Sequence, residues 1–249
     1  MPVRNGDTLI FPTPPVVRAW ASAGGKKESE GPLAGAFALL FPDASFQCGK
    51  WEKAESLLQQ KCVARCLAAA GLDQDQIDLA FAGDLQAQCT ASNYTMRALG
   101  APYAGLYGAC STMAEGLALA ACMAAAGYAA QALAFTSSHF CAAERQFRTP
   151  LDYGAKRTPT AQWTATAAGA CLLRGSGQQG VPVLSATFGR VQDYAVRDIN
   201  NMGAAMMPAA ASTLLRYFAA TGTSPADFDA VFTAVSYTHL RAHETRRHL

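Results

Sequence analysis

The chain has 249 residues, of which 51% are hydrophobic and 15% are charged, and its formal net charge at pH 7 is +2. This length and apolar content suffice for one sizeable core or for two small fused halves, and the charge balance gives no basic face that would bind nucleic acid. No apolar stretch is long enough to span a membrane, because the most apolar one, 114–134, is interrupted by Glu115, Gly127 and Gln131.

The first residues and the cysteine pattern indicate in which kind of cellular compartment the protein works. The first residues lack a basic region followed by an apolar run, so we expect no signal peptide and a cytosol-type protein. The eight cysteines lie within apolar or helical patterns without paired metal-ligand spacing, since Cys62 and Cys66 form a helical i, i+4 pair with no histidine nearby. This pattern favours reduced thiols, with no metal and no cofactor.

Helices and strands are predicted to alternate from residue 51 onward. Apolar residues recur at three-and-four spacing over 51–70, which predicts an amphipathic helix that ends at Gly71. The further predicted elements are a strand at 77–82, a helix at about 86–98, a strand at 103–107, a helix at 112–126, and strands at 132–136, 166–174 and 183–191. The polar stretch 142–164 is predicted to be a long functional loop. The alternation predicts a parallel sheet with helices against it.

Cys110 lies where the strand at 103–107 passes into the helix at 112–126. This helix carries one charged residue, Glu115, so its apolar character on all sides predicts the most buried helix of the fold. Thr112 and Glu115 fit a capping box, which would start the helix just after Cys110. The thiol would then lie at the positive end of the helix, where a thiolate is favoured. Alternatively, Cys110 is a small buried hydrophobe.

The segments 70–81 and 221–232 align without a gap. In both, a helix ends at a glycine, a polar turn follows, and the chain enters an apolar strand. The match indicates an internal duplication, although this pattern is also common by chance in α/β proteins.

Residues 235–249 show no apolar period and hold three of the four histidines. We interpret this segment as a non-native, out-of-frame or adapter-derived tail rather than as a basic or metal-binding tail, and exclude it from fold reasoning. It accounts for the whole net charge, because the rest of the chain has equal numbers of basic and acidic residues.

Four segments carry a specific pattern: 82–86, 105–112, 136–147 and 158–164. Together they resemble the stage V sporulation protein AD family of spore-forming Firmicutes. The similarity runs from about Gly31 to Thr233. The Cys-Ser-Thr element at 110–112 alone would indicate only a thiolase-like protein, whereas the Ser-Ser-His-Phe-Cys and Pro-Thr-Ala-Gln-Trp blocks narrow the resemblance to this family.

The resemblance implies a thiolase-like αβαβα layered fold with a complete first half and a partial second half. We therefore expect the N-terminal half at 1–180, the start of the second half at 181–234, and the non-native tail at 235–249. The chain would then be C-terminally truncated relative to the family.

The resemblance also implies a function. By this resemblance, the protein would be a non-enzymatic component of the spore channel that takes up and releases dipicolinic acid. It would bind this ligand, with calcium, during sporulation and germination. Implied partners are other stage V sporulation A proteins and, at full length, a second copy in a homodimer, but no nucleic acid. The implied location is peripheral to the inner spore membrane. Side chains in the family-like segments that suit this flat dicarboxylate are Cys110, Ser111, Ser138, His139, Gln162 and Trp163.

We expect these side chains to meet at one sheet edge. Cys110 and Ser138 each lie three residues past a predicted strand end, and residues after parallel strands converge there. His139 would approach the same cleft, with Gln162 and Trp163 as lid or wall. Arg145 and Arg148 lie on the adjoining loop, where they would either bind the ligand or belong to a solvated loop face or a subunit contact.

Two other functions stay open at this stage. Cys110 could be the catalytic nucleophile of an acyl-CoA-dependent condensing enzyme or acyltransferase of the ketoacyl-synthase type. The partner residues of that chemistry normally come from the second half, which leaves His139 as the possible base unless it is a hydrogen-bonded structural histidine. Alternatively, the chain is a structural subunit with a vestigial site.

Overall fold

The computed structural model describes residues 2–147, 164–197 and 202–233. The chain forms two compact units, one of Thr13–Val183 and one of Met1–Pro12 together with Leu184–Leu249. The predicted boundary between two thiolase-like halves, at 180/181, concerns the internal duplication and not these compact units. It stays a prediction. The proposed tail at 235–249 lies outside the described residues, as do Arg148, Gln162 and Trp163.

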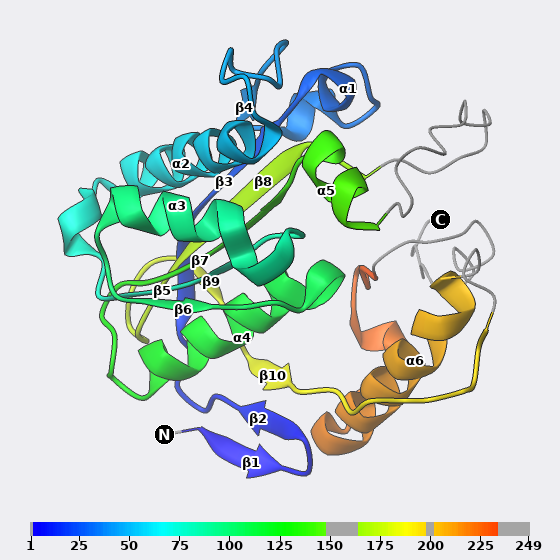
Figure 1. Cartoon of the computed structure of the whole chain (residues 1–249). Coiled ribbons are helices and arrows are strands. Elements are labelled where there is room, and N and C mark those ends of the chain that lie inside the picture. Colours follow the sequence, from blue (N-terminus) through cyan, green and yellow to red (C-terminus); the bar gives the residue numbers. More distant parts are fainter. Residues whose placement is uncertain (1, 148–163, 198–201, 234–249) are drawn as a thin grey trace. The chain divides into compact units, whose positions relative to one another are not determined.

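In the described part of Thr13–Val183, the strands form a seven-stranded mixed sheet (Figure 1). Across it they follow the order β4 (Leu39–Leu40), β3 (Val16–Gly24), β8 (Ala167–Arg174), β7 (Ala132–Ser138), β5 (Leu79–Gly83) and β6 (Tyr103–Gly105), with β9 (Val181–Pro182) also paired to β3. β5, β6 and β7 are parallel to one another, as predicted.

β8 departs from the parallel arrangement, because it runs antiparallel to both β3 and β7. Its first residue, Ala167, pairs with Ser138, the last residue of β7. The chain therefore re-enters the sheet at the edge where β7 left it, and the expectation of a parallel sheet is wrong for this strand.

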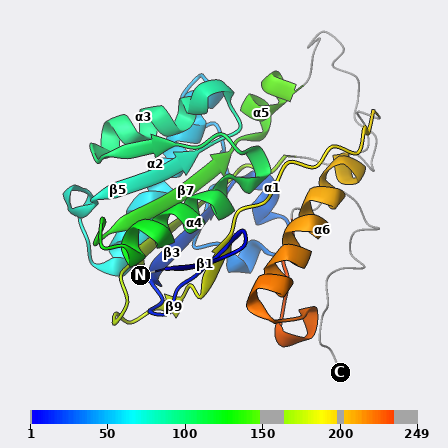
Figure 2. The same cartoon turned by 90° about the horizontal axis from the view of Figure 1, so that it is seen from below.

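Helices cover both faces of this sheet (Figures 1 and 2). α2 (Trp51–Ala70) and α3 (Thr90–Leu99) lie on one face, and α4 (Thr112–Ala125) lies on the other. The main core lies between the sheet and α2, where alternate residues of β3, β7 and β8 meet the buried side chains of Leu58, Cys62 and Cys66.

Most predicted elements are confirmed within a few residues. α2 has the predicted bounds, and Gly71 ends it in the left-handed conformation, with φ of 68°. Two predictions need correction. The expected loop at 142–164 begins later, because residues 140–147 form α5 (Phe140–Phe147), in which Ala142 and Ala143 are buried. The strand expected at 183–191 is reduced to β10 (Ser185–Thr187).

The prediction that α4 is the most buried helix is wrong. Its small residues Gly116, Ala120, Ala121 and Ala124 are buried against β5, β7 and β8. Other residues of α4 are half-buried, and Ala114 is exposed. Its composition permits burial on every side, but within this unit the sheet covers one side. α2 has the longer buried face.

The smaller unit contains an antiparallel sheet of β1 (Val3–Asn5), β2 (Thr8–Ile10) and β10, and the helix α6 (Met202–Thr221). Asp7, in the turn between β1 and β2, forms ion pairs with Arg190 at 2.8 Å and Arg216 at 3.2 Å. These pairs join the turn to α6 and to the segment after β10.

The two segments of the sequence repeat share local geometry. Gly71 and Gly222 both have φ of 68°, and Asp73 and Ser224 each form a capping box at the start of a short 3-10 helix. The first copy continues into β5, whereas the described residues 229–233 of the second copy form no strand. In the described part of the chain, no helix combines the length and the apolar character needed to cross a membrane.

Candidate functional site

The ends of β5, β6 and β7 meet at one edge of the large sheet. Ala82 pairs with Gly105 of β6 and Phe135 of β7, and Gly83 pairs with Thr136. The three strands are parallel, so the segments that follow them all leave from this edge, as predicted. The edge therefore brings together the turns that contain Asp84, Cys110 and His139.

Cys110 lies in the turn between β6 and α4. It is part of a 3-10 helix, Ala109–Ser111, that runs directly into α4, and its side chain is exposed. The prediction that α4 starts just after Cys110 is confirmed. The alternative, in which Cys110 is a small buried hydrophobe, is wrong.

The expected capping box between Thr112 and Glu115 is wrong. The residue before the first turn of α4 is Ser111, whose hydroxyl donates to the carbonyl oxygen of Gly108 at 2.8 Å. The hydroxyl oxygen of Thr112 accepts from the backbone N–H of Gly108 at 3.2 Å. Because the 3-10 helix continues into α4, no extended residue is present to form the box, and the two hydroxyl groups close the turn instead.

The cysteine turn is pressed against the end of β5. A Cβ atom on Gly83 would lie 2.0 Å from the carbonyl oxygen of Leu106 and 2.7 Å from Cγ2 of Thr112. The Cys89 thiol donates to the same carbonyl oxygen at 3.0 Å. A glycine at position 83 is thus required for the position of the cysteine turn and the start of α4.

Several residues with strained backbone conformations lie in the loops near this edge. Non-glycine residues with positive φ occur after β5, after β6 and in the loop before α2, namely Phe46, Gln47, Gln88, Cys89 and Ala109. Such conformations cost about 1–3 kcal/mol each and tend to occur at functional sites. Their location supports this edge as the candidate site.

Ser138 and His139 follow β7 at the same edge. The Ser138 hydroxyl donates to the carbonyl oxygen of Ala165 at 2.5 Å. His139 is buried, and its ring stacks on Trp51 with centroids 5.2 Å apart. Among the described residues, no hydrogen bond joins either side chain to Cys110.

Both ring nitrogens of His139 are engaged with backbone groups. Nδ1 accepts from the N–H of Cys141 at 3.2 Å, so Nε2 carries the proton and donates to the carbonyl oxygen of Ala44 at 3.1 Å. Burial lowers the pKa of His139, which keeps the ring neutral. This arrangement favours the structural alternative for His139.

A buried polar network lies beneath this edge, on the side of α2 and α3. Glu55 of α2, fully buried, accepts from Ser137 Oγ at 2.7 Å and from Gln86 Nε2 at 2.5 Å. Ser92 of α3 donates to Asp84 Oδ2 at 2.7 Å. The network thus connects both helices to the ends of β5 and β7.

Burial raises the pKa of Glu55 to about 7, against the opposing effect of its hydrogen bonds from Ser137 and Gln86. Glu55 is not among the site residues predicted from the sequence. Glu55 lies four residues after Trp51 and three before Leu58, so it interrupts the apolar stripe of the helix. A carboxylate within the apolar stripe of a predicted helix is the sequence signal that could have identified Glu55.

Among the described residues, no group of three or more His, Cys, Asp and Glu side chains could hold a metal ion. At this edge of the sheet lie the exposed thiol of Cys110 and the positive end of the 14-residue helix α4. The buried polar network of Glu55 and Asp84 lies beneath them. Such an arrangement can accept an anion or present a nucleophile.

Solved structures with a similar fold include OleA and FabH proteins. Cerulenin-bound OleA from Xanthomonas campestris has a TM-score of 0.67 and 16% identity, covering 97% of this chain and 81% of that chain. The 3-oxoacyl-(acyl carrier protein) synthase III FabH from Xanthomonas oryzae has a TM-score of 0.64 and 15% identity, with coverages of 98% and 81%. The fold, with its cysteine turn before α4, is therefore thiolase-like.

A family model described as stage V sporulation protein AD matches residues 5–236. The stage V sporulation protein AD of Bacillus subtilis strain 168 is 37% identical over 233 residues, which cover 94% of this chain and 69% of that protein. The chain belongs to the stage V sporulation protein AD family, a family of sporulation proteins, and the resemblance to this family is confirmed.

Proposed function

We propose that the protein binds dipicolinic acid, as its calcium complex, at the edge where β5, β6 and β7 end. It would serve the uptake of this ligand during sporulation and its release at germination. In this role it would work beside other stage V sporulation A proteins, peripheral to the inner spore membrane and as a homodimer at full length.

The start of α4 supplies chemistry that suits the ligand. A helix N-terminus favours a carboxylate through its free N–H groups and its positive partial charge. The exposed Cys110 lies directly at this end, next to Ser111. The hydroxyl protons of Ser111 and Ser138 and the N–H groups of Ser111 and Thr112 are used within the protein, so we propose that the positive end of α4 attracts the first carboxylate.

The observation that favours binding over catalysis is the state of His139. A general base needs a free lone pair close to the nucleophile. Nδ1 of His139 uses its lone pair on the N–H of Cys141, and Nε2 donates to Ala44. His139 would have to give up these bonds to activate Cys110, so we propose that it holds the site in shape from its buried position.

Isothermal titration calorimetry with calcium dipicolinate tests this function. We expect saturable heat with the wild-type protein and a clear loss of affinity for Cys110→Ala and for Ser111→Pro, which removes the hydroxyl and the N–H that close the turn on Gly108. Cys122→Ala, three turns into α4, is the matched control and should bind normally. Absence of heat with the wild-type protein would refute the function. Unchanged binding by both site variants would refute the site alone.

Cys110 also supports a second candidate function. An exposed thiol at the start of a helix suits acyl transfer in a condensing enzyme or acyltransferase of the ketoacyl-synthase type. Incubation with acyl-CoA followed by intact-mass spectrometry tests it. A thioester on Cys110 that is absent from Cys110→Ser would support this function, and no adduct would reject it.

A further inference from the structure

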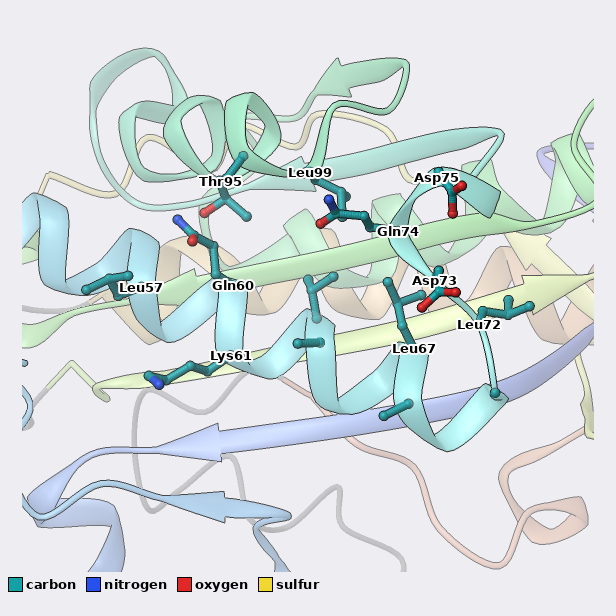
Figure 3. A pocket seen from close by; sticks show the side chains of 15 residues that line it. Leu57, Gln60, Lys61, Leu67, Leu72, Asp73, Gln74, Asp75, Thr95 and Leu99 are labelled. Carbon is teal, nitrogen blue, oxygen red and sulfur yellow. The ribbon is translucent and has the colours of Figure 1, made fainter.

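A groove runs between α2 and α3 on the outer side of the large sheet, away from the cysteine turn. Its larger part has a volume of about 1090 Å³ and is lined by α2, α3 and the turn after α2 (Figure 3). Val63 and Leu67 are buried at its base, and Leu57, Leu72 and Leu99 are half-buried in its walls. The groove is thus apolar at its base and open to solvent.

A second cavity, of about 690 Å³, continues this groove toward the start of α2. Leu57, Gln60 and Ala98 line both parts, so the two form one elongated depression. Its length follows α2, whose 20 residues extend over about 30 Å.

The two ends of the groove carry opposite charges. Lys50, Lys53 and Arg97 line the end near the start of α2 together with one carboxylate, Glu52, so basic groups outnumber acidic ones there, beside the exposed ring of Tyr94. Asp73 and Asp75 line the end at the turn after α2 (Figure 3). Lys61, on the rim, has its ammonium group 5.7 Å from the ring centroid of Phe41.

The walls of the groove are held at a fixed separation. Ser56 of α2 and Thr95 of α3 are 3.1 Å apart between their hydroxyl oxygens, and Gln59 donates to Ser92 at 3.0 Å. These bonds are buried, so the groove exists before any partner binds. A preformed groove avoids part of the ordering cost of association.

We propose that this groove binds an amphipathic helix of a partner protein. The apolar face of that helix would lie on Leu57, Leu72 and Leu99, with acidic side chains toward Lys53 and Arg97 and basic side chains toward the Asp73 end. A groove between two helices accepts the convex ridge of a third helix, whereas two concave grooves from two copies would not pack. The opposite charges at the ends select a partner with the complementary pattern and fix its direction. This surface is separate from the proposed ligand site.

Two synthetic helical peptides test the proposal. Each has about 18 residues, the same composition and the same Leu/Ala stripe. In the first peptide, the glutamates lie at one end and the lysines at the other. In the second peptide, glutamates and lysines alternate along the polar face. Fluorescence anisotropy should show that the first peptide binds at least about tenfold more tightly than the second.

Groove variants locate the binding. Ala64→Glu and Ala98→Glu place a charged side chain at exposed positions in the groove lining and should abolish binding, while circular dichroism stays unchanged. Ala69→Glu, at an exposed position of α2 outside the lining, is the matched control and should bind normally. Lys53→Glu with Arg97→Glu should remove the preference between the two peptides.

Two outcomes would overturn the proposal. One is equal binding of both peptides by the wild-type protein, or an equal loss in Ala69→Glu and Ala64→Glu. The other is self-association of the wild-type protein in sedimentation that Ala64→Glu abolishes, because a second copy would then occupy the groove.

Discussion

Ser137 and Glu55 are joined by a buried hydrogen bond of 2.7 Å from the serine hydroxyl to Oε1 of the glutamate. Ser137 belongs to the end of β7 and Glu55 to the first turns of α2, so the bond connects the candidate edge to the helix behind it. Gln59, one turn later, donates to the same hydroxyl oxygen at 2.8 Å. The position of Ser138 and His139 therefore depends on a carboxyl group that is far away in the sequence.

Stability should depend on pH through Glu55. Its pKa is raised from 4.5 to about 7, chiefly by burial, so the folded state favours the protonated form. The contribution is fully present below pH 4.5 and is lost as the pH rises through 7, by roughly 3 kcal/mol for a shift of this size. Urea denaturation at a series of pH values should show a flatter dependence for Glu55→Gln than for the wild type.

Glu30→Gln removes an exposed carboxylate and serves as the control for this measurement. An identical pH slope in Glu55→Gln and the wild type would contradict the assignment.

His139 should stay neutral below the pH at which an ordinary histidine titrates. Burial lowers its pKa from 6.5, so its stabilising effect is present above pH 6.5 and is lost as the pH falls through the lower, folded value. Nitrogen-15 NMR should show the proton on Nε2 at pH 7. A proton on Nδ1, or a midpoint above 6.5, would contradict the bonds to Cys141 and Ala44.

Gly83→Ala should be severely destabilising. The added Cβ would lie 2.0 Å from the Leu106 carbonyl oxygen, so either β5 or the cysteine turn must move. We expect a loss of about 3 kcal/mol or more in the free energy of unfolding. Gly169→Ala, in β8, is the matched control, because its Cβ would meet nothing within 4 Å. Equal denaturation midpoints for both variants would disprove the close approach.

Cys110 should be the first cysteine to react with iodoacetamide in the native protein, since it is the exposed one of the eight. Cys62 and Cys66 should react only after unfolding, because burial raises the pKa of each to about 12. Peptide mass spectrometry of samples labelled with and without urea measures both rates. Labelling of Cys62 before Cys110 would show that this face of α2 does not pack on the sheet.

The elements with a clear local pattern could be predicted from the sequence. The spacing of Leu58, Cys62 and Cys66 and the glycine at 71 define α2, because helix periodicity and a left-handed end are local properties. The extent of burial of α4 could not be predicted in the same way. Its composition tells which sides tolerate burial, but the neighbours decide which sides are covered.

The candidate site was predicted at the level of topology rather than of side-chain roles. Cys110 and His139 follow parallel strands, and the rule that such ends converge places both at one edge. The partners of His139, Trp51 and Ala44, come from a segment almost a hundred residues earlier, as does Glu55 for Ser137. Contacts at this separation leave no periodic signal in the local sequence.

The antiparallel pairing of β3 with β8 has a consequence for synthesis on the ribosome. Val16 pairs with Arg174 and Gly24 with Ala167, so β3 lacks this neighbour until almost the entire larger unit has been translated. At about 5–20 residues per second, the wait is roughly 7 to 30 s. During this interval the edge of β3 and the apolar face of α2 that packs on β3 and β8 are open to other chains. A nascent chain stalled before residue 167 should therefore recruit chaperones, and one that extends well beyond residue 183 should release them.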